Sequence, residues 1–181
     1  IVLSGNGVDY LPKPTMSGPH ILVVCTANIC RSPVGEALLR EQLRQAGLGD
    51  WTVSSAGTWA EGGHPASQFS LILLEERGLD IHGHSSQRVN GPLLAQCDLV
   101  LCMETAHQRD LCEAFPVHRA KIYTLRQMVH ERGSVRDPYG GSRRQYERMV
   151  TEVELLIEAG LPRIQQLARE NYQKRGGDGS S

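Results

Sequence analysis

The sequence predicts an α/β protein, a three-layer α/β/α sandwich built around a four-stranded parallel sheet. Short apolar runs that contain β-branched residues alternate with segments whose apolar residues recur every three or four positions. Strands and helices in alternation are joined by right-handed crossovers, which cover both faces of a parallel sheet. A chain of 181 residues suffices for one domain whose core needs neither disulfides nor a metal.

Four segments are predicted as strands because each is a short, mostly apolar run. They are residues 20–25, 51–55, 99–103 and 121–125. The first follows Pro19 directly and ends at Cys25. Ligands of open parallel sheets bind at the carboxyl ends of the strands, so Cys25 is expected at the ligand-binding edge.

The first helix is predicted from the residues that begin and end it. Ser32 offers a capping hydroxyl, Pro33 suits the first helical position, and Gly47 ends the helix. Shorter helices are expected at residues 65–77, 92–96 and 105–114.

The last helix is expected to begin near Ser142. Its apolar residues, from Tyr146 to Ile157, recur at three- and four-residue steps and predict one buried stripe. Gly160 and Pro162 are expected to interrupt the helix before a final helical segment.

Both ends of the chain are predicted to lie outside the domain, which we expect to span residues 20–173. Residues 1–19 are rich in Gly, Pro and Ser, which predicts a flexible extension. Met16 precedes the first strand closely and is a candidate for the natural start, in which case residues 1–15 are either non-native or a flexible arm. Residues 174–181 are expected to form a disordered tail.

Composition argues against several classes of protein. The chain has 19 Lys and Arg against 20 Asp and Glu, without a basic run, so no nucleic-acid partner is expected. No apolar stretch approaches the roughly 20 residues of a membrane span, so no membrane insertion is expected. The five cysteines lie within apolar runs, which favours a reducing, cytoplasmic location.

The segment with the clearest chemistry follows the first strand and reads Cys25-Thr26-Ala27-Asn28-Ile29-Cys30-Arg31-Ser32. A loop between a strand and a helix can turn its amides inward, and the helix N-terminus adds positive potential. We therefore predict a phosphate-binding loop there, in which Arg31 binds two phosphate oxygens and Ser32 donates to the Cys25 sulfur. Asn28 suits a position with positive φ. The spacing alone is equally compatible with a core cysteine and a surface arginine.

This segment, C-T-A-N-I-C-R-S-P, resembles the signature of the low-molecular-weight protein tyrosine phosphatases, bacterial branch. Three later segments resemble the same family: Ser54-Ser55-Ala56-Gly57-Thr58, Asp98-Leu99-Val100-Leu101-Cys102-Met103-Glu104 and Asp137-Pro138-Tyr139-Gly140. The resemblance extends over about residues 20–170.

The resemblance implies that Cys25 is the nucleophile, Arg31 the phosphate clamp and Asp137 the general acid, without metal or cofactor. A thiolate that attacks phosphorus gives a phosphocysteine, and a departing phenolate, with a parent pKa near 10, gains from a proton. An Asp-Pro pair by itself is also typical of a turn. The remaining loop residues assigned to substrate binding are Thr26, Ala27, Asn28, Ile29, Cys30 and Ser32.

Four residues receive supporting roles, each with a plainer alternative. Tyr139 and Trp59 are candidates for the walls of a slot around an aromatic ring, although Trp59 is equally compatible with surface packing. The resemblance implies that His84 braces the loop through Asn28, and a solvated loop histidine is the alternative. It also implies a reversible disulfide between Cys30 and the nucleophile, with steric filling as the alternative.

Other functions remain possible at this stage. Arsenate reduction would relay oxidation to Cys102 and Cys112, and protein arginine phosphatases share the resemblance, although the apolar Ile29 favours an aryl phosphate. A zinc site formed by the two cysteine pairs is disfavoured because Arg31 would face the metal. A module that only binds phosphoproteins would need neither Cys25 nor Asp137.

The implied partner is a phosphotyrosine-containing protein, such as a bacterial tyrosine kinase. We expect the chain to be a monomer or a weak dimer.

Overall fold

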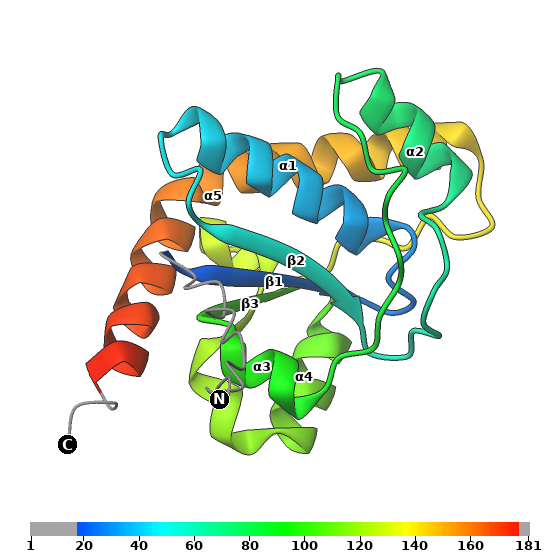
Figure 1. The fold of residues 1–181 in the computed structure, drawn as a ribbon. Coiled ribbons are helices and arrows are strands. Elements are labelled where there is room, and N and C mark those ends of the chain that lie inside the picture. The colour runs from blue at the N-terminus through cyan, green and yellow to red at the C-terminus, as the bar shows by residue number, and fades with distance from the viewer. Residues whose placement is uncertain (1–17, 178–181) are drawn as a thin grey trace, which may run out of the picture.

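The computed structural model describes residues 18–177, so most of the predicted N-terminal extension lies outside the described range. Four strands form one parallel sheet in the order β2-β1-β3-β4. Their bounds are β1 His20–Cys25, β2 Thr52–Gly57, β3 Leu99–Cys102 and β4 Ile122–Thr124. The predicted three-layer α/β/α sandwich is confirmed, since helices cover both faces of this sheet (Figure 1).

The helices divide into two layers. One layer contains α1 Arg31–Gln45, α2 Gln68–Glu75 and α5 Arg143–Gly177, and the other contains α3 Gly91–Gln96 and α4 Thr105–Ala114. Two 3-10 helices, η1 Pro116–Lys121 and η2 Leu125–Val129, flank β4.

Alternation along β1 explains why both layers are needed. Ile21 and Val23 belong to the apolar cluster beneath α1 and α5, whereas Leu22 and Val24 belong to the cluster beneath α3 and α4. Successive side chains of a strand point to opposite faces, and all four of these are buried. The parallel sheet is therefore apolar on both faces, as the uninterrupted apolar run from Ile21 to Val24 in β1 predicts.

Helix α5 corrects the prediction of an interruption at Gly160 and Pro162. It runs without a break over 35 residues, and Pro162 lies inside it. Its second half turns away from the first, as the change of direction shows (Figure 1). Packing explains why residue 160 is a glycine, because a Cβ there would lie 2.7 Å from the Cβ of Met128 in η2. The glycine thus permits close helix packing instead of ending the helix.

The C-terminal boundary also differs from the prediction, because residues 174–177 are helical. Arg175 reaches back to the buried Asp98, with Nε 2.8 Å from Oδ1 and Nη2 3.0 Å from Oδ2. Asp98 in turn accepts from the amide of His20 at 2.8 Å. This contact ties the end of α5 to the beginning of the sheet, so the ordered chain extends past residue 173.

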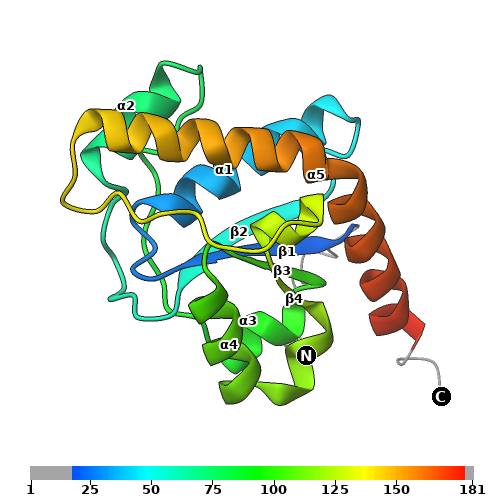
Figure 2. The same ribbon diagram turned by 180° about the vertical axis from the view of Figure 1, so that it is seen from behind.

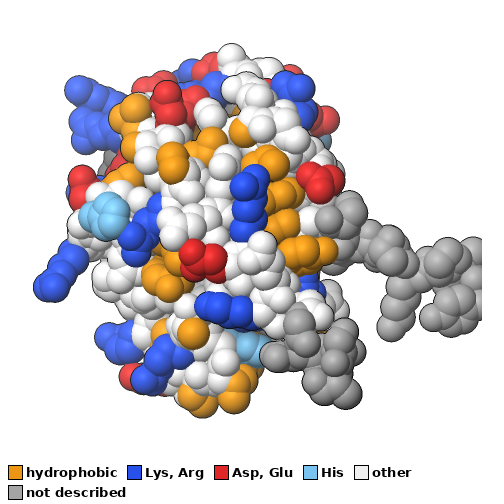
Figure 3. Space-filling model, turned by 90° about the vertical axis from the view of Figure 1, so that its left-hand side faces the viewer, with side chains coloured by type: hydrophobic (Ala, Val, Ile, Leu, Met, Phe, Trp, Pro, Cys, Tyr) orange, Lys and Arg blue, Asp and Glu red, His pale blue; other side chains and the backbone are white. Residues whose placement is uncertain are grey.

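The two ends of the sheet differ in character. Figure 3 shows the end that carries the second half of α5, where basic, acidic and hydrophobic side chains are interspersed. The opposite end holds the carboxyl ends of the strands and the loop after β1 (Figure 1). Among the helices of residues 18–177, none combines the length and apolar character needed to cross a bilayer.

Candidate active site

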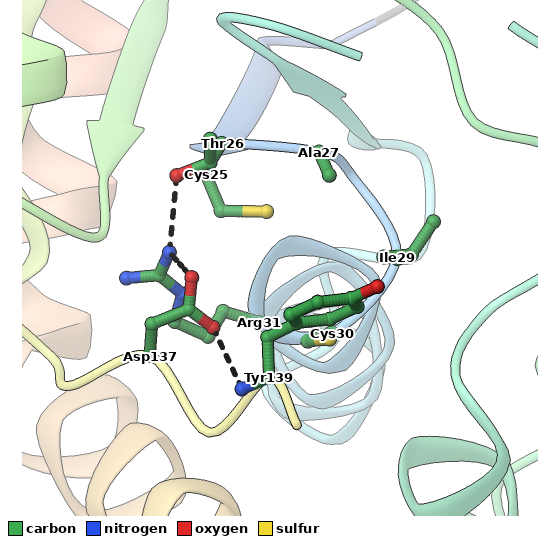
Figure 4. A pocket seen from close by; sticks show the side chains of 8 residues that line it. All are labelled: Cys25, Thr26, Ala27, Ile29, Cys30, Arg31, Asp137 and Tyr139. Carbon is green, nitrogen blue, oxygen red and sulfur yellow. Dashed lines mark hydrogen bonds and ion pairs between the residues drawn. The ribbon is translucent and has the colours of Figure 1, made fainter. Parts of the chain in front are cut away.

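A cavity of about 280 Å³ lies at the carboxyl end of β1, over the loop that joins β1 to α1 (Figure 4). Eight residues line it: Cys25, Thr26, Ala27, Ile29, Cys30, Arg31, Asp137 and Tyr139. Six come from the loop and its borders, and two come from the segment before α5. The cavity therefore joins parts of the chain that are about 100 residues apart in sequence.

The loop holds its carbonyl groups outward. Of the six consecutive carbonyl oxygens from Cys25 to Cys30, all but that of Ala27 accept hydrogen bonds from outside the loop. The donors are Thr58 N to Cys25 (2.9 Å), Trp59 N to Thr26 (2.9 Å), His84 Nε2 to Asn28 (2.7 Å), Ser67 N to Ile29 (2.7 Å) and Ser70 Oγ to Cys30 (3.0 Å). In a trans peptide the carbonyl and the next amide point in opposite directions. The amides of the loop consequently turn toward its centre, which creates a concave site for an anion.

Asn28 fixes the shape of this loop. It has φ of 57°, in the left-handed region that asparagine tolerates better than most residues. Its Nδ2 donates to Ser32 Oγ and to Ser55 Oγ, both at 2.9 Å, and its Oδ1 accepts from the amide of Gln87 at 2.9 Å. The side chain is fully buried, so these bonds are made in a region of low dielectric.

The polarity of this network directs a hydrogen bond toward the sulfur. Ser32 Oγ lies 3.0 Å from Cys25 Sγ and accepts from Asn28. Its hydroxyl proton is therefore available to Cys25 Sγ or to the Ala56 carbonyl, which is 3.3 Å away. Ser55 accepts from Asn28 as well and donates to Glu36 Oε2 at 2.5 Å. A thiolate at Cys25 would thus face a donor with a fixed position.

Gly57, at the end of β2, permits the loop to pass close by. A Cβ at this position would collide with the carbonyl oxygen of Thr26 and lie 2.9 Å from the amide nitrogen of Asn28. The close approach lets Thr58 and Trp59 donate their amides to the loop.

Arg31 is almost fully buried, with 1% of its side chain exposed, and two carboxylates face its guanidinium. Nη1 binds the Glu104 carboxylate and donates to the Val135 carbonyl at 3.0 Å. Nη2 donates to Asp137 Oδ2 at 2.6 Å and to Thr26 Oγ1 at 3.2 Å (Figure 4). A buried cation requires such partners, and they hold the guanidinium in one orientation.

Asp137 lies at the rim of the cavity on the segment between η2 and α5. Val135 anchors that segment, since its amide donates to the Met103 carbonyl at 2.7 Å and its own carbonyl accepts from Arg31. Asp137 Oδ1 accepts from the amide of Tyr139 at 3.1 Å, while 42% of its side chain is exposed. The carboxylate is thus held over the loop and still reaches solvent.

Comparison with known proteins gives a consistent result. The profile described as "Low molecular weight phosphotyrosine protein phosphatase" matches residues 20–173. The chain belongs to this family. A protein of Ralstonia nicotianae named "Probable low molecular weight protein-tyrosine-phosphatase EpsP" is 33% identical over 147 residues, which are 81% of this chain and 97% of that protein.

A second relative is named for a different activity. The "Protein-arginine-phosphatase" of Geobacillus stearothermophilus is 35% identical over 81% of this chain and 96% of its own length. Among solved structures, the low molecular weight protein tyrosine phosphatase from T. tengcongensis has a TM-score of 0.76 and 35% identity, and the match covers 80% of this chain and 99% of that chain.

The predicted residues of this family member divide into those that meet at the cavity and those that do not. His84 lies beside the loop, with Nε2 2.7 Å from the Asn28 carbonyl oxygen. Because a carbonyl only accepts, Nε2 carries a proton. Tyr139 lines the cavity and is 73% exposed. Trp59 does not line it; its ring is 70% exposed and lies 5.1 Å from the Arg88 guanidinium carbon.

Cys30 lines the cavity but is buried among neighbours of its own. Its Sγ lies 3.3 Å from Tyr146 Oη, and Tyr146 packs against Phe69 with ring centroids 5.3 Å apart. Burial raises the pKa of the Cys30 thiol, and burial together with the Cys30 contact raises the pKa of Tyr146 to about 12. In the ligand-free protein Cys25 and Cys30 are both free thiols.

The helix boundary beside the loop corrects one sequence prediction. Helix α1 begins at Arg31, with Cys30 at the cap position, and no side chain caps it. The Ser32 hydroxyl instead serves the bonds to Asn28 and Cys25. The buried thiol of Cys25 and the buried amide of Asn28 both lie within hydrogen-bond distance of this oxygen, which accounts for its position.

Several residues of the site were missed by sequence reasoning. Glu104 follows β3 directly, and a polar residue at the carboxyl end of a parallel strand is a usable signal. His107 lies one helical turn further, with Nε2 2.9 Å from Thr26 Oγ1 and Nδ1 buried without a partner. Ser55 and Gln87 carry no local signal, because only the fold brings them to Asn28.

The other cysteines lie away from the cavity lining. Cys97 and Cys102 are fully buried, and burial raises the pKa of both thiols, that of Cys97 to about 12. Cys112 is half-buried in α4. Within residues 18–177 there is no group of three or more His, Cys, Asp or Glu side chains arranged to hold a metal.

Proposed function

We propose that the protein hydrolyses phosphotyrosine in other proteins through a phosphocysteine at Cys25. The observation that carries the proposal is that Cys25 Sγ, at a loop whose amides face inward, lines the same cavity as the Arg31 guanidinium and the Asp137 carboxyl group (Figure 4). A thiol, a cation and a carboxyl group are the three groups that phosphoryl transfer from an aryl ester requires.

In the first step the Cys25 thiolate attacks phosphorus, an S–P bond forms and the P–O bond to the tyrosine phenol breaks. Protonated Asp137 gives its proton to the departing phenolate oxygen, so neutral tyrosine leaves. The loop amides and Arg31 hold the non-bridging phosphate oxygens while charge on them redistributes. Ser32 donates to the sulfur before and after the attack.

In the second step a water attacks the phosphocysteine. Asp137, now a carboxylate, removes a proton from that water, the S–P bond breaks, and inorganic phosphate and the Cys25 thiolate are released. One residue therefore acts as acid and then as base, which its exposed position at the rim supports. The reaction needs neither a metal nor a redox partner.

The apolar walls of the cavity support an aryl substrate. Ala27 and Ile29 line one side and Tyr139 the other, so a phenyl ring would contact carbon atoms on both faces. Phosphoarginine is the second candidate, because one relative is named a protein arginine phosphatase. The guanidinium of a phosphoarginine in the same place would bind better beside a hydroxyl group that accepts a hydrogen bond than beside the apolar side chain of Ile29. Ile29→Thr should therefore shift preference toward phosphoarginine.

Arsenate reduction is less well supported. It would require Cys25 to pass an oxidising equivalent to further thiols, and Cys102 is fully buried between β1 and β4. The carboxyl group at the rim also has no role in that relay.

We further propose a cytoplasmic location and a phosphotyrosine protein, such as a bacterial tyrosine kinase, as partner. Five free thiols, four of them buried, support a reducing compartment. Fractionation of cells that produce the protein tests the location. The phosphotyrosine content of proteins in cells that lack it tests the partner.

The test is phosphate release from phosphotyrosine, phosphoarginine and phosphoserine peptides of one sequence, in EDTA. We expect rapid release from phosphotyrosine and at least tenfold slower release from the others, with no release by Cys25→Ser. Faster release from phosphoarginine would overturn the substrate but keep the thiolate chemistry. Reduction of arsenate with thioredoxin, without peptide hydrolysis, would overturn the proposal entirely.

A further inference from the structure

A groove leads away from the active-site cavity along the first half of α5. Asp137 lines the cavity and also a smaller hollow of about 150 Å³, which Arg136 and Arg148 line as well. Arg148 also lines an open groove of about 660 Å³, which extends along the helix to Leu155. The three hollows thus share lining residues and form one path. The segment before α5 and the first half of that helix lie together on the face seen in Figure 2.

Most charges along this path are already paired. Glu131 and Glu152 both bind Arg126, and Glu147 lies 2.8 Å from Arg143. Arg143 has a further partner in Glu76, at 2.7 Å.

Three arginines on this path remain: Arg136, Arg144 and Arg148. All are exposed, and none lies within 4.0 Å of a carboxylate oxygen of residues 18–177. The two hollows beyond the active-site cavity are lined by four arginines and four acidic residues, so their formal charges balance. What distinguishes the path is pairing: Glu131 and Glu152 share Arg126, and three of the four arginines are left without a carboxylate partner among residues 18–177.

Arg144 stands where an arginine is electrostatically unfavourable. The first turn of α5 contains no acidic residue, and the N-terminal end of a helix carries partial positive charge. An arginine without a carboxylate partner at that position does not stabilise the helix, and its guanidinium is available to an external carboxylate. At the other end of the groove Leu155 is 59% exposed and offers an apolar contact.

We propose that this groove binds the acidic flank of the phosphoprotein substrate. The inference rests on the proposed function, because the phosphorylated side chain enters the cavity beside Asp137 while Asp or Glu residues on one side of it lie against Arg136, Arg144 and Arg148. Carboxylates match the unpaired guanidinium groups, and an apolar residue beyond them would contact Leu155. The substrate class is thus a phosphotyrosine segment with acidic residues on one flank.

The test compares phosphotyrosine peptides that differ only in their flanks: acidic before the tyrosine, acidic after it, or the amide isosteres Asn and Gln. We expect kcat/KM to be about fivefold to tenfold higher for one acidic peptide than for the amide peptide, through KM. The advantage should shrink as salt rises from 0.05 to 0.5 M, since exposed charges are screened.

Matched variants distinguish an effect of the groove from an effect of the overall charge of the protein. Arg144→Glu combined with Arg148→Glu should abolish the acidic advantage and leave hydrolysis of a small aryl phosphate unchanged. Arg119→Glu, an exposed arginine in η1, should change neither. Arg144→Glu alone should also raise Tm, because an acidic residue suits the first turn of α5, so loss of preference cannot be attributed to unfolding.

Equal kcat/KM for acidic and amide peptides, or an acidic advantage that survives both substitutions, would overturn the inference. Binding of anionic phosphatidylglycerol vesicles through these arginines, without a peptide preference, would also overturn it. If no aryl phosphate is hydrolysed at all, the proposed function fails separately. Salt-dependent binding of the acidic peptide, followed by fluorescence anisotropy, then still tests the groove.

Discussion

Arg31 Nη2 lies 2.6 Å from Asp137 Oδ2, so the proposed phosphate clamp and the proposed acid are paired with each other. A phosphate group that takes both terminal nitrogens of Arg31 must displace this carboxylate. The displaced carboxyl group then lies beside the dianion and the leaving oxygen, where protonation is favoured. Substrate binding and preparation of the acid are thus one event.

The pairing predicts that Asp137→Ala binds inorganic phosphate more tightly than the unmodified protein. Removal of the carboxylate frees the Nη2 of Arg31, while Nη1 keeps its contact with Glu104. For a pair that is partly exposed the gain is about 1 kcal/mol, or about fivefold in Kd. Calorimetric titration with phosphate measures it. Tyr139→Phe serves as the control, because the backbone amide that holds Asp137 is retained. Weaker phosphate binding by Asp137→Ala would contradict the competition.

Asp137→Ala should also slow turnover in a way that depends on the leaving group. Without the acid, esters of phenols with pKa near 10 should lose about 10²–10⁴ in kcat, and p-nitrophenyl phosphate much less. A series of aryl phosphates measures the dependence. Equal losses across the series would show that Asp137 does not protonate the leaving oxygen.

Arg31→Lys is expected to lose most of the affinity for phosphate and part of the stability. A lysine ammonium cannot form the two-pronged bond to phosphate, nor reach Glu104, Asp137 and the Val135 carbonyl together. Phosphate inhibition constants and urea unfolding measure the two effects. Unchanged inhibition by phosphate would exclude Arg31 as the clamp, whatever the change in stability.

His107 predicts a loss of stability in mildly acidic solution. Burial lowers the pKa of His107, and the positive charge of Arg31 lowers it further. Nearby carboxylates, Glu104 above all, raise the pKa but do not outweigh these two effects. The folded protein therefore binds this proton less readily than the unfolded chain, and the free energy of unfolding falls as pH drops below about 6.5. His107→Gln should show a smaller loss between pH 7.5 and 5.5 in urea unfolding. Equal slopes for His107→Gln and the unmodified protein would refute the assignment.

The contact between Arg175 and Asp98 makes a prediction about the end of α5. Asp98 is buried, and Arg175→Ala removes two charge-assisted bonds from it. The expected loss is about 1–3 kcal/mol in the free energy of unfolding. Lys174→Ala is the control and should change little, because Lys174 is exposed and makes no ion pair with residues 18–177. A loss within 0.5 kcal/mol for Arg175→Ala would mean that residues 174–177 are not part of the stable fold.

The sequence was sufficient to predict the parallel sheet because each strand is a short apolar run and β1 ends at the motif itself. It was insufficient for α5, where Gly160 reads locally as a helix end but is required by the approach of Met128. The first residues of the predicted tail, 174–177, are helical for a similar reason, since the partner of Arg175 lies 77 residues away.

Within the site, the loop residues were predictable because the motif begins where β1 ends and finishes where α1 begins. Glu104 and His107 were missed, as their contacts with Arg31 and Thr26 arise only when β3 lies beside β1. Trp59 was placed near the ring slot by its position after β2, but its side chain turns toward Arg88. Backbone position follows from pattern, whereas side-chain direction depends on packing that no local signal encodes.

The most direct test of the account is to trap the intermediate. The protein is mixed rapidly with a phosphotyrosine peptide, quenched in acid, digested and examined by mass spectrometry. The account predicts one phosphoryl group on the peptide that contains Cys25, formed before phosphate appears in solution and longer-lived in Asp137→Ala. Release of phosphate without any phosphorylated Cys25, or with the phosphoryl group on another residue, would contradict it.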